Sequence, residues 1–299
     1  MLVNCERERL TVPGSATRVR ASLQLDFEFD GATGRTVLRG SRQQAPLRVV
    51  RAFTQEDGAA LVHLHNVSGG LLGGDRLELA VKVAPGAAAQ LTSTGATRVY
   101  RALAGYSDTV QVNCISVAEN ALLEYVPDPL IPFAGARLRQ FTSIHLAGGA
   151  GLFWWDIVAP GREARGEVFA YERLEVQTTL QACGRWIAIE RVRLEPGKRR
   201  LTAPTRMGNY RYWATFYICR VGLDAKLWLE AERQLRCAAR EVAQSGASLW
   251  GVSAMPAHGL VVRGLTLHGR DAIAGVRAIW QAAKRLVFGR EVILPRKIN

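Results

Sequence analysis

Strict alternation over residues 77–83 is the feature that most constrains how this chain can fold. Four apolar side chains occupy every second position there: Leu77, Leu79, Val81 and Val83. Because successive side chains of a strand point to opposite faces, this spacing predicts a β-strand with one buried face. The pair Pro85-Gly86 follows at once and predicts a tight turn.

The same organisation recurs along the chain. Strand-like apolar segments end at Val117, Leu146 and Leu194, and each is followed by a turn rich in Gly, Asn or Pro. The turns are too irregularly spaced for a strict repeat. Residues 20–222 are therefore predicted to be mainly β, with an irregular β-solenoid (β-helix-like) core of long strands; a β-sandwich is also compatible with the pattern.

The periodicity changes after residue 222, where apolar residues recur at helical intervals. The first predicted helix begins near residue 223 and stops at Gly246. Its buried stripe is predicted to be Leu223, Leu227, Ala231, Leu235, Ala238 and Val242. A second helix is predicted from Asp271 to about Phe288, ending at Gly289, with a short β segment at 259–263 between the two.

No linker or low-complexity tract divides the chain. Residues 1–299 are therefore predicted to form a single domain, with a β-rich core over 20–222 and two α-helices within a helical portion over 223–290. No run of about 18 apolar residues is present, so no membrane-spanning helix is expected. The N-terminal residues lack the apolar core of a secretory signal. Five scattered cysteines without a CxxC pair argue against disulfide and Cys-zinc frameworks and favour a cytoplasmic location.

The charge balance raises the question of nucleic acid. The chain has 39 Lys and Arg against 26 Asp and Glu, a net charge of +13. The basic residues are spread from Arg7 to Lys297, and no RNP-like motif, zinc finger or basic heptad region is present. This distribution favours a solvated basic face or a surface that meets an acidic protein partner. A nucleic-acid-binding protein remains the first alternative function.

The glycine-rich segment 68–76 is the most distinctive in the chain, SGGLLGGDR. It lacks the Gly-Lys-Ser/Thr ending of a P-loop, and the strand that follows offers no helix N-terminus for a phosphate. We interpret it as a backbone crossing that needs positive φ angles or close approach, which only glycine allows.

Three carboxylates stand where apolar side chains are expected. Asp75 shares parity with Leu77 and Leu79, and Glu190 shares parity with a set of apolar residues on its own strand. That set is Trp186, Ala188, Val192 and Leu194. Asp156 interrupts the most apolar stretch of the chain. A buried carboxylate is costly unless it is paired or hydrated, so these residues indicate either buried ion pairs or a polar, water-filled passage or metal site.

His63 and His65 lie two residues apart and would share one face of a strand. Such a pair can hold a transition metal, but the sequence identifies no further ligand. We therefore favour the simpler interpretation, in which both are half-exposed strand histidines.

Several blocks, in order, resemble the family of the urease accessory protein UreD, called UreH in some systems. The strongest is GGLLGGDRLE at 69–78, with Gly69, Gly70, Gly73, Gly74 and Arg76 in the signature positions. The further blocks are PGA at 85–87, LTST at 91–94, ATRVYR at 96–101, LEYVP at 123–127, FAGARLR at 133–139, GR at 161–162, RGE at 165–167 and ERVRL at 190–194. Val67-Ser68 and Asp156, where the family usually has prolines and a Glu, depart from the pattern.

This resemblance implies a mainly β, solenoid-like fold and a non-enzymatic role in urease maturation. Family members act with the accessory protein UreF and the GTPase UreG on apo-urease structural subunits, so that nickel reaches the buried active site. No cofactor is expected to be tightly bound, and Ni²⁺ is expected only in transit. The resemblance also implies a water-filled passage for the ion.

The passage and the misplaced carboxylates suggest one hypothesis. An ion in transit needs oxygen ligands that release it readily. We expect Asp75, Glu78 and Glu190 to line the passage, with Asp156 and Glu124 as weaker candidates. The second alternative function is a carbohydrate-active β-solenoid enzyme that uses a pair of carboxylates.

Overall fold

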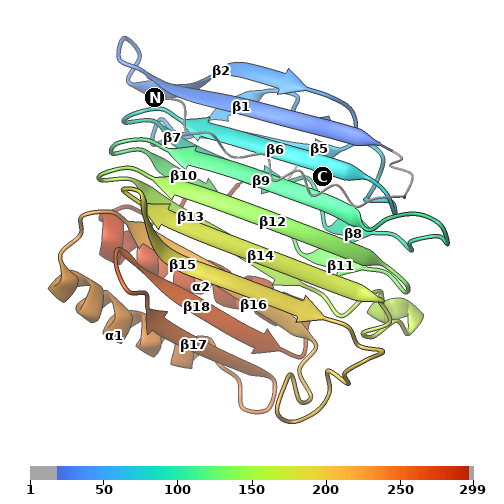
Figure 1. Cartoon of the computed structure of the whole chain (residues 1–299). Coiled ribbons are helices and arrows are strands. Elements are labelled where there is room, and N and C mark those ends of the chain that lie inside the picture. Colours follow the sequence, from blue (N-terminus) through green and yellow to red (C-terminus); the bar gives the residue numbers. More distant parts are fainter. Residues whose placement is uncertain (1–18, 296–299) are drawn as a thin grey trace.

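Two facing β-sheets make up most of the computed structural model, which describes residues 19–295 (Figure 1). Cys5 and the N-terminal segment considered above lie outside the described residues. The smaller sheet has the strand order β15 (Arg185–Leu194), β14 (Arg173–Ala182), β12 (Arg137–Leu146), β9 (Thr109–Val117), β6 (Arg76–Val83), β1 (Arg20–Asp30) and β2 (Arg35–Gln43).

The larger sheet has eleven strands. Its main order is β17 (Ser248–Ala254), β18 (Gly259–Thr266), β16 (Tyr212–Arg220), β13 (Gly151–Val158), β10 (Leu122–Tyr125), β7 (Ala88–Ser93), β5 (Ala60–Asn66) and β3 (Leu47–Arg48). Three short strands lie off this path: β4 (Ala52–Thr54), β8 (Thr97–Val99) and β11 (Leu130–Pro132). A 3₁₀ turn, η1, spans Glu163–Arg165.

The chain passes repeatedly from one sheet to the other. β6, β9 and β12 stack in parallel in the smaller sheet, while β7, β10 and β13 stack in parallel in the larger. Each coil of the chain thus contributes a strand to both sheets, which confirms the predicted irregular solenoid. The antiparallel strands β15 and β16 end the parallel stacking.

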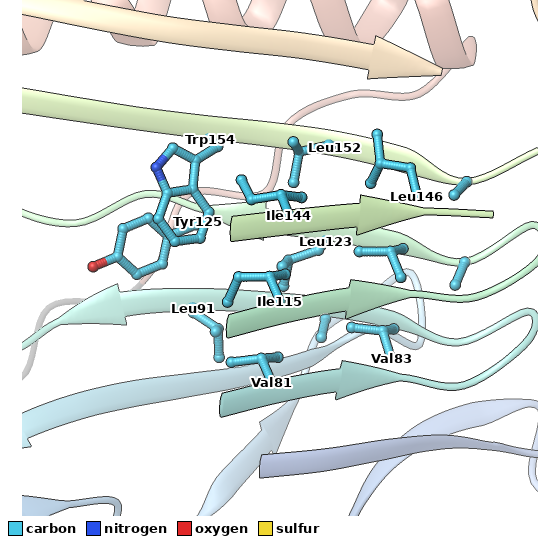
Figure 2. Close-up of a cluster of buried hydrophobic side chains, with 14 of the residues drawn as sticks. Val81, Val83, Leu91, Ile115, Leu123, Tyr125, Ile144, Leu146, Leu152 and Trp154 are labelled. Carbon is cyan, nitrogen blue, oxygen red and sulfur yellow. The ribbon is translucent and has the colours of Figure 1, made fainter. Parts of the chain in front are cut away.

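An apolar core fills one part of the space between the sheets (Figure 2). The smaller sheet contributes Val81, Ile115 and Ile144, and the larger sheet contributes side chains such as Leu123 and Trp154. Every one of these five is at most 1% exposed. The strand ends predicted at Val117, Leu146 and Leu194 are confirmed.

Two helices cover the outer face of the larger sheet: α1 (Ala225–Val242) and α2 (Gly269–Phe288). Both predicted helices are confirmed, and Gly289 ends α2 with a φ of 62°. The stripe of α1 was predicted wrongly at Leu227, which is 54% exposed because the neighbouring Trp228 packs on the sheet instead. The predicted stop at Gly246 was also wrong, since α1 ends at Val242.

A buried ion pair fastens α2 to the sheet beneath it. Lys284 Nζ lies 2.7 Å from Glu124 Oε1, and Trp280 Nε1 donates to Glu124 Oε2 at 2.8 Å. Both charged side chains are at most 4% exposed. Burial raises the pKa of Glu124, and the Lys284 charge opposes that shift. The pair therefore satisfies two charges that would be costly if either were buried alone.

The glycines between β5 and β6 meet two different requirements. Gly69 and Gly74 have positive φ angles of 78° and 89°. A Cβ on Gly70 would lie 2.7 Å from the carbonyl oxygen of Arg98, and one on Gly73 would lie 2.9 Å from Ala102 Cα. The signature therefore needs glycine twice for its backbone conformation and twice for close approach to β8 and the segment that follows it.

The Glu124–Lys284 ion pair predicts that removing one charge costs more stability than removing both. K284M should lower the free energy of unfolding by about 3–5 kcal/mol, because it leaves Glu124 buried without a counter-charge. The double variant E124Q/K284M should be distinctly more stable than K284M, since no buried charge remains. Urea unfolding followed by circular dichroism measures both. K226M, at an exposed lysine of α1, is the control; an equal loss in K226M and K284M would contradict this account.

The close approach at Gly70 predicts that G70A costs about 1–3 kcal/mol of unfolding free energy through overpacking against Tyr100 and Arg98. G148A is the matched control, because Gly148 is exposed and a Cβ there meets nothing within 4 Å. It should change stability by less than about 0.5 kcal/mol. Thermal unfolding of both variants tests this, and a G70A protein as stable as G148A would refute it.

Candidate functional site

A row of polar side chains crosses the smaller sheet on its inner face. Asn113, Thr142, Thr178 and Glu190 are direct register neighbours on β9, β12, β14 and β15. The first three are at most 4% exposed. Asn113 Nδ2 donates to Thr142 Oγ1 at 3.0 Å. Parallel, in-register pairing of β9, β12 and β14 brings the first three residues to one height between the sheets, and the antiparallel pairing of β14 with β15 places Glu190 beside Thr178.

The larger sheet carries a matching row. Asp156, Thr215 and Arg263 are register neighbours on β13, β16 and β18. Gln140 Nε2, from the smaller sheet, donates to Asp156 Oδ1 at 3.1 Å and so connects the two sheets. Trp154 Nε1 donates to Asp156 Oδ2 at 3.1 Å. We call the two rows together the polar layer: Asn113, Thr142, Thr178, Glu190, Asp156, Thr215 and Arg263.

Asp156 and Glu190 meet within this layer. They line one small cavity of about 10 Å³, together with Thr178, Thr215 and Tyr217. That volume is about the space of a single water molecule. The Tyr217 hydroxyl donates to Glu190 Oε2, and Arg263 Nη2 lies 3.2 Å from the same oxygen. The structure thus brings together two of the five carboxylates predicted from sequence, one from each sheet.

The electrostatics of the site disfavour a negative charge on Asp156 next to Glu190. Burial raises the pKa of Asp156; hydrogen bonds from Trp154 and Gln140 oppose this shift, and the negative charge of Glu190 adds to it. Burial and the Glu190 charge also raise the pKa of Tyr217, which keeps its hydroxyl a donor. A cation placed between the two carboxylates would relieve their repulsion and replace lost hydration.

Carboxylate, hydroxyl and amide oxygens suit a hard or borderline divalent cation held weakly. Within residues 19–295 there is no group of three or more His, Cys, Asp or Glu side chains arranged to hold a metal ion. An ion beside Asp156 and Glu190 would therefore complete its coordination with hydroxyl or amide oxygens or with water.

The other three predicted carboxylates lie elsewhere. Asp75 is 3% exposed, and its Oδ2 accepts from the Leu72 amide at 2.9 Å, which closes the glycine-rich turn. Glu78 faces outward and pairs with Arg76 at 2.8 Å, with 51% of its side chain exposed. Glu124 lies on the helix side of the larger sheet, bound to Lys284. The structure does not bring these three together with Glu190.

The predicted parity of Glu190 with Trp186 is wrong. A register shift between Leu180 and Gln181 leaves Ile187 without a partner on β14. This bulge turns Trp186 outward, where it is 55% exposed, while Ile187 is 4% exposed. Glu190 still faces inward, because the bulge lies before it in the strand.

Sequence reasoning missed the uncharged members of the layer and both partners of Glu190. Asn113, Thr142 and Thr178 sit at inward positions of apolar strands, so their parity was a readable signal. Tyr217 and Arg263 belong to strands whose contact with Glu190 depends on how the two sheets face each other. Local spacing carries no such information.

A larger cavity of about 300 Å³ lies beside the glycine-rich turn. Its lining includes Gly69, Gly70, His65, Gln111 and Tyr125. The Tyr125 ring stacks on Trp154, with 3.9 Å between ring centroids. Because Trp154 also donates to Asp156, a chain of contacts runs from the cavity through the two rings to the carboxylate pair.

The prediction of two half-exposed histidines holds for His65 and is wrong for His63. His63 is buried, and its ring packs edge-on against Phe53 at a centroid distance of 5.8 Å. His65 lines the larger cavity, where burial and then the charge of His63 lower its pKa. The lowered pKa favours the neutral imidazole, which is the form that binds metals.

Comparison with known proteins gives one consistent result. The family model described as "UreD urease accessory protein" matches residues 19–299. A urease accessory protein UreD of Herpetosiphon aurantiacus is 46% identical over 94% of this chain and 97% of its own length. Those of Pseudomonas fluorescens and Klebsiella pneumoniae are 34% and 29% identical over 93% and 91% of this chain, and 94% and 93% of their own lengths.

Among residues 19–295, no helix has the length and apolar character needed to cross a membrane.

The accessory role of the relatives favours a non-catalytic part in urease maturation, as the resemblance in the sequence implied. The glycine signature, the solenoid and the matched relatives agree, and the chain belongs to the UreD family of urease accessory proteins.

Proposed function

We propose that this protein is a cytoplasmic scaffold of a metallochaperone complex that supports nickel insertion into apo-urease. It would act with a UreF-like accessory protein and a UreG-like GTPase, because its own sequence offers no P-loop. In this role the polar layer is the path of the ion, and Asp156 and Glu190 are the groups that bind it in transit. Asp75, Glu78 and Glu124 lie off this path.

One observation carries the proposal: two carboxylates from opposite sheets line one small cavity, which the polar layer shares with Val176, Val192 and Trp213. A buried row of amides, hydroxyls and carboxylates is costly in a sandwich core. It offers an ion successive oxygen ligands in place of its water shell. Two carboxylates bind Ni²⁺ less tightly than a closed Cys and His site would, which suits an ion that must leave again.

The alternatives fit the geometry less well. A carbohydrate-active enzyme would need a cleft that admits a sugar ring between its carboxylates, and the cavity between Asp156 and Glu190 is only about 10 Å³. A nucleic-acid surface needs arginines that are available to phosphates. Several arginines on the outer face of the smaller sheet are instead paired with acidic side chains: Arg137 with Asp108, Arg139 with Glu175 and Arg193 with Glu195.

The proposal predicts a loading defect without an assembly defect. Cells that carry the urease operon but lack this gene are complemented with wild-type, D156N, E190Q or double-variant chains. The double variant should lower the nickel content of purified urease about tenfold, a typical loss when a group that tunes a metal site is removed. Co-purification with the UreF-like protein should be unchanged, because both side chains are internal.

E78Q is the matched control, since Glu78 is an outward carboxylate of the same sheet, and it should load urease normally. Full nickel loading by the double variant would contradict the proposed path. Full loading of urease in cells that lack the gene altogether would contradict the proposed function.

A further inference from the structure

We propose that Arg263 is a displaceable counter-ion of Glu190. Its guanidinium stays paired with Glu190 until a divalent cation binds the two carboxylates and takes its place. This inference rests on the proposed function and adds to it a residue that sets the affinity of the same site. The Arg263 guanidinium contacts Glu190, with 3.2 Å between Nη2 and Oε2.

The position of Arg263 follows from the unequal widths of the two sheets. The smaller sheet ends at β15, whereas the larger continues from β16 through β18 to β17 (Figure 1). Thr215 on β16 is 5% exposed, but its register neighbour Arg263 has 58% of its side chain exposed. Gly251, the next residue of that row on β17, adds no side chain, and a Cβ there would meet nothing within 4 Å. Arg263 therefore stands at the open side of the polar layer.

The contact with Glu190 uses one oxygen only. Both the Tyr217 hydroxyl and Arg263 Nη2 bind Oε2. Within residues 19–295, no donor is placed on Oε1, and 19% of the Glu190 side chain is exposed. The second oxygen is thus available to a cation, and Glu190 and Asp156 line the same cavity.

The chemistry of the pair makes it a competitor of a metal ion. A guanidinium stays charged at every physiological pH, so Arg263 always repels a cation that approaches Glu190. Ion pairs with a highly exposed partner are weak, so the side chain can swing into solvent when a better counter-ion arrives. A divalent cation is such a counter-ion, because it attracts Asp156 and Glu190 together.

Two roles for Arg263 are distinguishable. If it only ties β18 to the edge strand, its removal changes stability and leaves metal affinity as it was. If it competes with the cation, its removal raises metal affinity, and this gain disappears when Glu190 is neutralised too. Nickel affinity of the purified protein is therefore the decisive readout, independent of urease loading.

The experiment is isothermal titration of the purified full-length chain with nickel chloride. R263Q should lower the Kd for Ni²⁺ at least about fivefold relative to wild type, the scale of a weak ion pair that no longer competes. R263M serves as a second variant without hydrogen-bonding groups and should show the same gain. E190Q/R263Q should bind no tighter than E190Q.

R191Q is the matched control, because Arg191 follows Glu190 directly but lies exposed on the outer face. It removes the same charge and should leave the Kd within about twofold, since exposed charges are screened by solvent and salt. The inference is overturned if R263Q and R263M bind nickel no tighter than wild type, including the case in which neither the variants nor the wild type binds nickel. It is also overturned if R191Q raises the nickel affinity as much as R263Q does. A normal urease nickel content in D156N/E190Q would instead overturn the proposed path, so the two failures are separable.

Discussion

Parallel, in-register pairing between successive coils is the constraint on which the rest of the structure depends. Because β6, β9 and β12 stack without offset, a side chain at one height of a coil lies beside its equivalent in the next. Apolar positions therefore merge into a continuous core. The same rule makes a polar residue expensive in isolation, but it lets Asn113 and Thr142 satisfy one another across neighbouring strands.

Two buried carboxylates show opposite ways of meeting the cost of burial. Glu124 has a full counter-charge, with Lys284 and Trp280 on its two oxygens, and this closed arrangement is suited to holding α2 in place. Among the described residues, Asp156 accepts only from the neutral donors Gln140 and Trp154, and the nearby charge of Glu190 acts against its ionisation. A site left short of positive charge in this way is suited to a visiting cation, whereas the Glu124 site has no need of one.

The sequence was informative for several elements whose structure depends on local pattern, although it placed the end of α1 and the burial of Leu227 wrongly. The ends of β9 and β12 and the extent of α2 follow from alternation, turn residues and capping glycine. Which carboxylates meet depends on how two sheets face each other, and no local spacing contains that. Strand parity places Glu78 on the face opposite Leu77 and Leu79, and it does face solvent, but nothing in the spacing shows that Glu190 and Asp156 line one cavity. The bulge at Ile187 likewise comes from pairing with β14 and was not visible in the strand alone.

The termination of the smaller sheet links two requirements that are usually separate. An edge strand such as β15 must avoid pairing with other chains, and bulges and inward-pointing charges are common ways to prevent it. β15 has both, in the bulge at Ile187 and in Glu190. The inward charge that protects the edge is also the last member of the polar row, at the one strand where that row comes close to solvent. Under the proposed function, one carboxylate both protects the edge and gives ions access to the polar layer, which would account for its place on an edge strand.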